Sequence, residues 1–140
     1  MKILVDTCIL SEVRHPQGRP QIRERFATLD PESLYLSVLT LGELTKGIQQ
    51  LPAGKRKQAL SLWLEAIIET AGPRIIPVDE ETARIWGETT AQAKAQGKTI
   101  PPIDGLIAAT AIQHGMRVMT VNTTDFEPTG AMILNPLEDT

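Results

Sequence analysis

The sequence is poor in several residue types that common functions require. Cys8 is the only cysteine among the 140 residues, so an intrachain disulfide and a cysteine-based zinc site are both excluded. Only five side chains are aromatic, which leaves few surfaces on which single-stranded bases could stack. These side chains are Phe26, Tyr35, Trp63, Trp86 and Phe126.

Long apolar runs and several well-known motifs are also missing. No stretch approaches the roughly 20 apolar residues of a membrane-spanning helix. The apolar run before Asp6 is only Ile3, Leu4 and Val5, which is too short for the apolar core of a signal peptide. A phosphate-binding P-loop, a dinucleotide-binding GxGxxG and a serine-hydrolase GxSxG do not occur. We therefore expect a cytoplasmic protein without a membrane segment.

The composition is otherwise ordinary for one globular domain covering residues 1–140. Apolar residues make up 41% of the chain and charged residues 22%. The formal net charge is −3, but residues 14–57 carry a local charge of +4 and residues 58–140 one of −6. This asymmetry allows a basic face on an acidic protein, although scattered charges on solvated helix faces are the commoner explanation.

Short apolar runs alternate with helical patterns along the chain. Strand-like runs cover residues 2–5, 34–38, 74–78 and 117–121, with a weaker one at 131–134. Apolar side chains recur at helical spacing over residues 22–29, 41–51, 60–68 and 83–93, and residues 105–114 are apolar almost all round. The alternation predicts an α/β fold with a parallel sheet covered on both faces. In such sheets, ligands bind beyond the carboxyl ends of the strands.

Acidic residues stand at those strand ends, and each has a structural alternative. Asp6 and Asp79 follow strands directly and Asp104 opens the apolar helix, so all three could cap helices. Glu43 ends the sequence Thr-Leu-Gly-Glu, which is a capping-box pattern. Asp125 follows the fourth strand, where an Asx turn would explain it.

Taken together, the acids favour a metal site. Two carboxylates about 4 Å apart repel each other by roughly 4 kcal/mol at an effective dielectric near 20, so a cluster needs a cation or shifted pKa values. Oxygen donors suit Mg²⁺ or Mn²⁺, whereas His15 and His114 have no second ligand at metal spacing. Such ions polarise phosphate oxygens and activate water. Cys8 stands where a phosphoaspartate phosphatase would need a second aspartate, so phosphodiester hydrolysis is the favoured reaction.

Four segments resemble the motifs of the PIN-domain ribonucleases. They are LVDTCILSE at 4–12, LYLSVLTLGEL at 34–44, PPIDGLIAATAIQHG at 101–115 and TVNTTDF at 120–126. The segments occur in the family's order and span nearly the whole chain. The likeness is strongest to VapC-type toxins of bacterial toxin–antitoxin pairs, in the FitB-like branch.

The resemblance implies a fold and a set of site residues. The fold is a single PIN-like domain with a parallel sheet of about five strands flanked by helices. The catalytic cluster is Asp6, Glu43, Asp104 and Asp125. In it, Asp6 and Asp104 bind Mg²⁺ or Mn²⁺, and Glu43 helps to orient water, directly or through a second metal. Asp125 is the most peripheral acid, with Asn122 and Thr120 as polar neighbours. Many members carry Asn where this chain has Cys8, so an amide is missing there.

The resemblance also implies an activity and partners. The activity is metal-dependent cleavage of RNA by an activated water, as the toxin of a toxin–antitoxin pair. The implied partners are a second copy of the chain and an antitoxin, and operator DNA is bound only through the antitoxin. The competing hypothesis is a PIN-like binding module with a degenerate or structural metal site that acts only through a partner. Candidates for contacts to RNA phosphates are Arg14, Arg19, Arg23, Arg25, Lys46, Lys55, Arg56 and Lys57.

Overall fold

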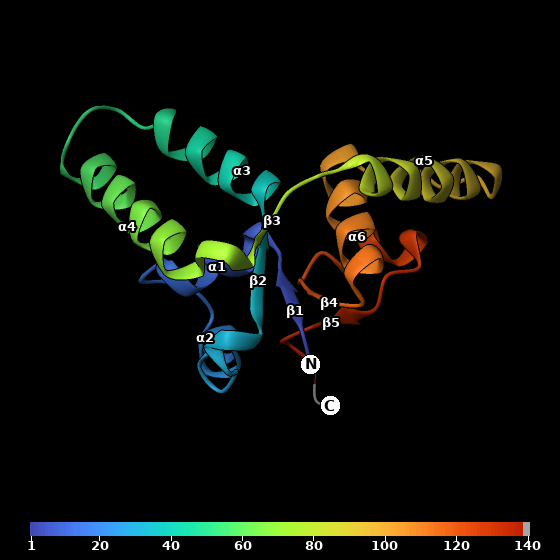
Figure 1. Cartoon of the computed structure of the whole chain (residues 1–140). Coiled ribbons are helices and arrows are strands. Elements are labelled where there is room, and N and C mark those ends of the chain that lie inside the picture. Colours follow the sequence, from blue (N-terminus) through green and yellow to red (C-terminus); the bar gives the residue numbers. More distant parts are fainter. Residues whose placement is uncertain (139–140) are drawn as a thin grey trace.

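The computed structural model describes residues 1–138, in which helices and strands alternate along the chain (Figure 1). The strands are β1 (Ile3–Val5), β2 (Leu34–Ser37), β3 (Ile75–Ile76), β4 (Arg117–Met119) and β5 (Ile133–Leu134). The helices are α1 (Thr7–Arg14), α2 (Pro20–Ala27), α3 (Val38–Gln49), α4 (Lys55–Ala71), α5 (Glu80–Ala95), α6 (Pro102–His114) and α7 (Thr123–Phe126). Three 3₁₀ turns join helices to strands, at Pro31–Ser33, Gly72–Arg74 and Glu127–Thr129.

The strands form one parallel sheet in the order β3-β2-β1-β4-β5. Ile3 of the central strand pairs with Leu34 on one side and with Arg117 on the other. The predicted parallel sheet of about five strands is confirmed. Strand β3 covers only two residues of the predicted run 74–78, because Arg74 closes a 3₁₀ turn and Pro77 has no N–H to donate to a ladder.

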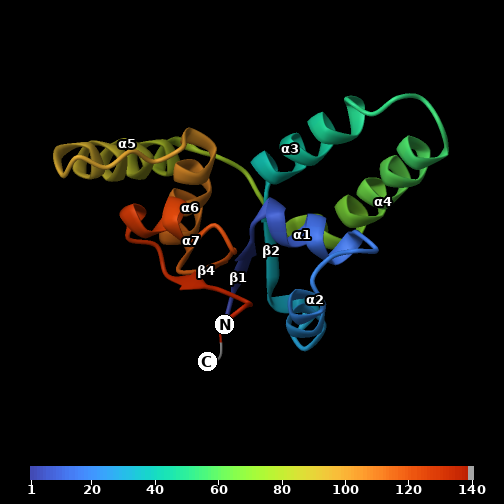
Figure 2. The same ribbon diagram turned by 180° about the vertical axis from the view of Figure 1, so that it is seen from behind.

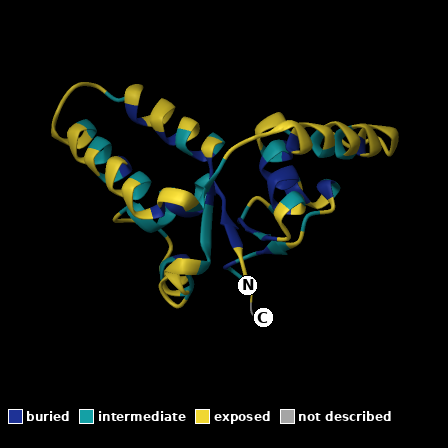
Figure 3. Ribbon diagram, in the orientation of Figure 1, coloured by how far each residue is buried: buried dark blue, intermediate teal, exposed yellow. Residues whose placement is uncertain are grey.

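Helices cover the sheet on both faces, and alternate residues of each strand supply the two cores. Ile3 and Val5 belong to a core closed by α1 to α4, whereas Leu4 belongs to a second core closed by α6 and α7. Seen from behind, the two groups of helices remain on opposite sides of the sheet (Figure 2). Figure 3 shows buried residues along the strands and α6, whereas α5 is exposed over much of its length. Among residues 1–138, no helix combines the length and apolarity needed to cross a bilayer.

Helix α6 is the predicted apolar helix, and most of it is buried as expected. Residues 107–111 are all buried, and Gly115 ends the helix in the left-handed conformation at φ 65°. At its first turn, Gly105 packs beneath Trp86 of α5. A Cβ atom on Gly105 would lie 3.0 Å from Trp86 Cδ1 and 3.2 Å from Ile100 Cγ2. The close approach of α5 and α6 therefore depends on this glycine.

Of two helix-capping predictions, the one at Asp79 is confirmed and the one at Glu43 is not. Asp79 caps α5, as predicted, and it forms a capping box with Thr82. The capping-box interpretation of Thr40 and Glu43 is wrong. Ser37 is the cap of α3, accepting a hydrogen bond from the Leu39 N–H at 3.0 Å, so Thr40 already lies within the helix. Glu43 is thereby left for a tertiary contact.

Candidate active site

The candidate site lies where the strand order reverses. The chain leaves β1 toward β2 on one side, and β4 pairs with β1 on the other, so the crevice beyond their carboxyl ends is the expected ligand position in this architecture. Asp6 directly follows β1, and Thr120 directly follows β4. Glu43 lies on the second turn of α3, which follows β2 without a loop.

Asp6 is buried and held by three neighbouring groups. Only 3% of its surface is exposed. One carboxylate oxygen accepts a hydrogen bond of 2.8 Å from the Thr7 N–H, which caps α1, so the predicted capping role is confirmed. The other oxygen accepts a hydrogen bond of 2.8 Å from the Thr120 hydroxyl and one of 3.4 Å from the Cys8 thiol. Capping and a role in the site are therefore compatible for this residue.

Glu43 is tied to the start of α1 by Thr7. The Thr7 hydroxyl donates to Glu43 Oε1 at 2.7 Å and lies 3.2 Å from the buried hydroxyl of Thr40. The backbone N–H of Thr7 binds Asp6 at the same time. Thr7 therefore connects two of the four acids that were predicted to form the cluster.

Asp104 and Asp125 approach from the opposite group of helices. Asp104 lies in the first turn of α6, and Asp125 is the third residue of α7 rather than part of an Asx turn. Partial burial, and after it the charges of Asp6, Asp125 and Glu43, together raise the pKa of Asp104 to about 6. A side-chain hydrogen bond with Asp125 acts in the same direction. The structure thus places Asp104 within electrostatic range of the other three predicted acids.

The cluster carries uncompensated negative charge. Within residues 1–138, the ion pairs are Arg19–Glu12, Arg74–Glu32 and Arg84–Glu80, and none involves a residue of the cluster. The side chains around the acids offer mainly oxygen donors, the set that hard divalent cations prefer. In the described part of the chain, however, no three acidic, histidine or cysteine side chains are placed closely enough to hold one ion together. The residue types of the cluster fit a divalent cation.

Two residues of the site were not predicted from the sequence. Thr7 and Thr40 carry no motif of their own, and only the position of Thr7 directly after Asp6 hinted at a role. Cys8 was predicted only as a departure from the family pattern. Burial is the main cause that raises the pKa of its thiol to about 11, and the Asp6 charge adds to it. The thiol is therefore a neutral neighbour of Asp6 at physiological pH.

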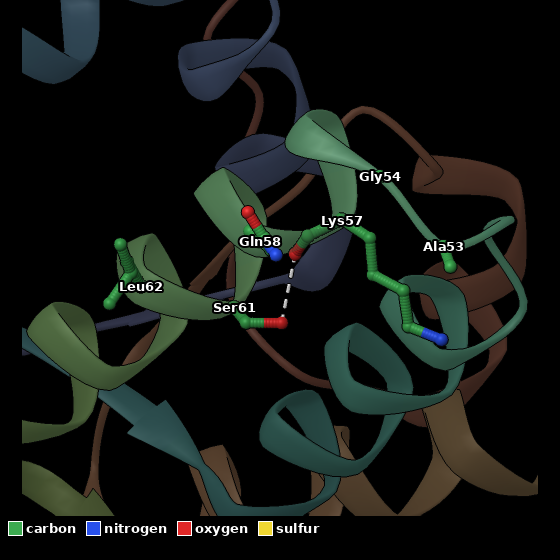
Figure 4. Close-up of a pocket in the computed structure, with 6 residues that line it drawn as sticks. All are labelled: Ala53, Gly54, Lys57, Gln58, Ser61 and Leu62. Carbon is green, nitrogen blue, oxygen red and sulfur yellow. Dashed lines mark hydrogen bonds between the residues drawn. The ribbon is translucent and has the colours of Figure 1, made fainter.

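A hollow elsewhere on the surface has no acidic residue in its lining. It has a volume of about 600 Å³, lies at the start of α4 and is lined by Ala53, Gly54, Lys57, Gln58, Ser61 and Leu62 (Figure 4). In it, the Ser61 hydroxyl donates to the Lys57 carbonyl at 2.9 Å. Lys57 Nζ donates to the carbonyl of Gln49 at the end of α3. These contacts join helix ends and offer no chemistry.

Comparison with known proteins shows which family the chain belongs to. A model of the PIN domain matches residues 3–130. The chain belongs to the PIN domain family. Toxin FitB of Neisseria gonorrhoeae is 38% identical over 138 residues, which cover 98% of this chain and 99% of FitB. VapC ribonuclease Y4jK of Sinorhizobium fredii is 37% identical over 137 residues, covering 97% and 98%.

A solved structure extends the likeness to three dimensions. The structure of FitAB bound to an IR36 DNA fragment matches with a TM-score of 0.94 at 37% identity, covering 99% of this chain and 97% of that one. The predicted resemblance to PIN-domain ribonucleases of the VapC type, in the FitB-like branch, is confirmed. In this PIN domain, Asp6 directly follows the central strand, and the other three acids are carried by α3, α6 and α7.

Proposed function

We propose that residues 1–140 form a single PIN domain that acts as a metal-dependent endoribonuclease, the toxin of a toxin–antitoxin pair. The observation that carries the proposal is the electrostatic environment of Asp104, where the charges of Asp6, Asp125 and Glu43 add to burial in raising its pKa. Relatives that match nearly the whole chain are named as a VapC ribonuclease and a FitB toxin, which supports the same activity.

In this proposal, Asp6 and Asp104 would hold Mg²⁺ or Mn²⁺. A bound divalent cation supplies charge neutralisation at the scissile phosphate and lowers the pKa of water. Thr120 and the Thr7 N–H fix the carboxylate of Asp6, so that it keeps one orientation. Glu43, fixed in turn by the Thr7 hydroxyl, orients the attacking water and accepts its proton. Asp125, beside Asp104, is the peripheral acid of the cluster.

The proposed partners follow from the same relatives. We infer that the chain forms a homodimer and is neutralised by an antitoxin whose gene lies beside its own. The likeness to FitAB bound to DNA supports DNA contact through the antitoxin rather than through this chain. An arginine of the antitoxin would suit the unpaired acids, since guanidinium and carboxylate form bidentate hydrogen bonds.

Cleavage of RNA by the purified chain tests the proposal. Protein freed of any co-purified partner is incubated with a panel of structured RNAs in Mg²⁺ or Mn²⁺, in EDTA, and in EDTA followed by excess Mn²⁺. We expect internal cuts that stop in EDTA, return with Mn²⁺, and are missing for Asp6→Asn. Cleavage that continues undiminished in EDTA would contradict the metal mechanism. A chain that cuts no RNA of the panel but binds its partner would support the binding-module alternative.

A further inference from the structure

A groove leads away from the acids between α1, α3 and α4. It has a volume of about 200 Å³, and its walls include Thr7, Ser11 and Arg14 of α1, Glu43 of α3, and Arg56 and Trp63 of α4. The three helices adjoin on the same side of the sheet in both views (Figures 1 and 2). Thr7 and Arg14 lie two turns apart on one helix face, a rise of about 10 Å. The groove therefore joins the acidic cluster, at Thr7 and Glu43, to a basic end.

The basic end contains two neighbouring guanidinium groups. The Arg14 guanidinium carbon lies 5.7 Å from the centre of the Trp63 ring, a cation–π contact. Burial, and secondarily the charge of Arg56, lowers the pKa of Arg14. Neither arginine forms an ion pair within residues 1–138. An adjoining hollow of about 390 Å³ is lined by both arginines and by His15.

We propose that this groove binds the RNA backbone next to the cleavage site, with Arg14 and Arg56 as phosphate-binding residues. The inference rests on the proposed function and adds the path of the substrate. Trp63 covers one face of the Arg14 guanidinium, whereas the N–H donors at its edge match phosphate oxygens. Arg14 and Arg56 repel each other and neither has a carboxylate partner within residues 1–138, so an anion that binds between them relieves this repulsion.

The acidic cluster itself makes such contacts necessary. Four carboxylates repel an approaching polyanion, and the chain as a whole carries a net charge of −3. Contacts of Lys and Arg with phosphates supply most of the sequence-independent affinity for nucleic acid. Residues 14–57, which contain both arginines, carry a local charge of +4. The basic end thus provides attraction about 10 Å from the point where the substrate meets the acids.

Binding without cleavage gives the most direct test. The chain carrying Asp6→Asn, freed of any partner and kept in EDTA, is titrated into a fluorescein-labelled single-stranded RNA of mixed sequence, and anisotropy is recorded. Arg14→Gln and Arg56→Gln are compared in this background with Lys94→Gln, which removes the same charge from the exposed end of α5. We expect each arginine variant to weaken binding about threefold to tenfold and Lys94→Gln to change nothing. The slope of log K against log salt should become shallower by about 0.7 for each phosphate contact removed.

The outcomes separate this inference from the ribonuclease proposal. Equal binding by the double arginine variant and its parent, or no measurable binding by the parent, would overturn the inference. If the double variant binds RNA normally but no longer retains a co-purified protein, the groove is a docking site for that protein and the inference is wrong. Arginine-dependent RNA binding without any cleavage by the wild-type chain would leave the groove assignment standing and refute the ribonuclease.

A kinetic measurement completes the test in the cleaving chain. Arg56→Gln should raise KM severalfold with kcat unchanged, because a phosphate contact outside the reacting bond stabilises the bound substrate and the transition state equally. Arg56 is exposed, so this variant remains informative if Arg14→Gln fails to fold. Arg56→Lys should restore most of the lost affinity, since it keeps the charge. A fall in kcat at constant KM would contradict the assignment.

Discussion

Thr120 donates a hydrogen bond of 2.8 Å to the buried carboxylate of Asp6, although 114 residues separate them in the sequence. This contact joins the ends of the two neighbouring strands β1 and β4. The Thr120 hydroxyl also accepts the Asn122 N–H at 3.0 Å, so its proton is directed toward Asp6. Thr120 is therefore a positioning residue for the central acid of the cluster.

Replacing Thr120 by Val should disturb both stability and metal binding. An unpaired buried acceptor costs about 1–3 kcal/mol, and loss of a partner behind a metal ligand typically lowers metal affinity or activity about 10- to 100-fold. Thr120→Ser keeps the hydroxyl and serves as the matched control. Urea unfolding and a Mn²⁺ titration of cleavage would measure the two effects. Normal Mn²⁺ dependence in Thr120→Val would argue against the positioning role.

Removing one site charge should abolish activity without weakening the fold. Asp6→Asn and Asp104→Asn relieve repulsion within the cluster, and Asn at position 6 can still cap α1. We expect no cleavage, an unchanged or higher melting temperature without metal, and loss of most of the shift that Mn²⁺ gives the wild type.

Asp79→Ala provides the contrasting variant for that experiment. This substitution removes the cap of α5. The Asp79 side chain binds Thr82 and Gln113 and none of the four acids. Cleavage and the Mn²⁺ shift should be nearly normal, with a lower melting temperature in both conditions. If Asp104→Asn behaved like Asp79→Ala, Asp104 would be a helix-end residue without a role in the site.

The raised pKa of Asp104 predicts a specific pH dependence of stability. Its carboxyl titrates near pH 6 in the folded chain and near 3.8 when the chain unfolds. The folded state therefore holds the extra proton between these values, and the contribution of this group to stability is lost as pH rises toward and past 6. In EDTA, the unfolding free energy of the wild type minus that of Asp104→Asn should fall as the pH rises from 4 to 7. A flat difference would contradict the shifted pKa.

The packing of Gly105 against Trp86 predicts opposite effects of two similar substitutions. Gly105→Ala places a Cβ atom 3.0 Å from the indole ring, and overpacking of this kind typically costs about 1–3 kcal/mol. Gly87→Ala on α5 meets no atom within 4 Å, so the better helix propensity of Ala should stabilise the chain by up to about 1 kcal/mol. Thermal unfolding of both variants would check the signs. Equal effects would mean that α5 moves freely over α6.

The sheet was predictable because its signals are local. Each strand is an apolar run bounded by a helix or a turn, and alternation of strands and helices dictates parallel pairing. Strand lengths were less predictable. Pro77 shortens β3, and the ladder that a residue joins depends on neighbours distant in the sequence.

The site was predictable only in part, for a similar reason. The acids could be found because strand ends meet at one edge, and the electrostatic contact at Asp104 agrees with that expectation. The hydrogen bond between Thr7 and Glu43 spans 36 residues and has no local signature. The capping-box pattern at Thr40 misled because Ser37, three residues earlier, is an equally good cap and lies directly at the strand end. The assignment of metal ligands stays a prediction.

The order in which the chain is made has a bearing on when it can act. Asp6 and Glu43 belong to the first third of the sequence, but Asp104, β4 and Asp125 come from its last quarter or so. The partner of Asp6 at Thr120 also arrives late. A nascent chain that still lacks these segments has half of the acids, and it lacks β4, the neighbour of β1 that Thr120 directly follows. The chain would therefore gain a complete site only after its last quarter has been synthesised and has folded against β1.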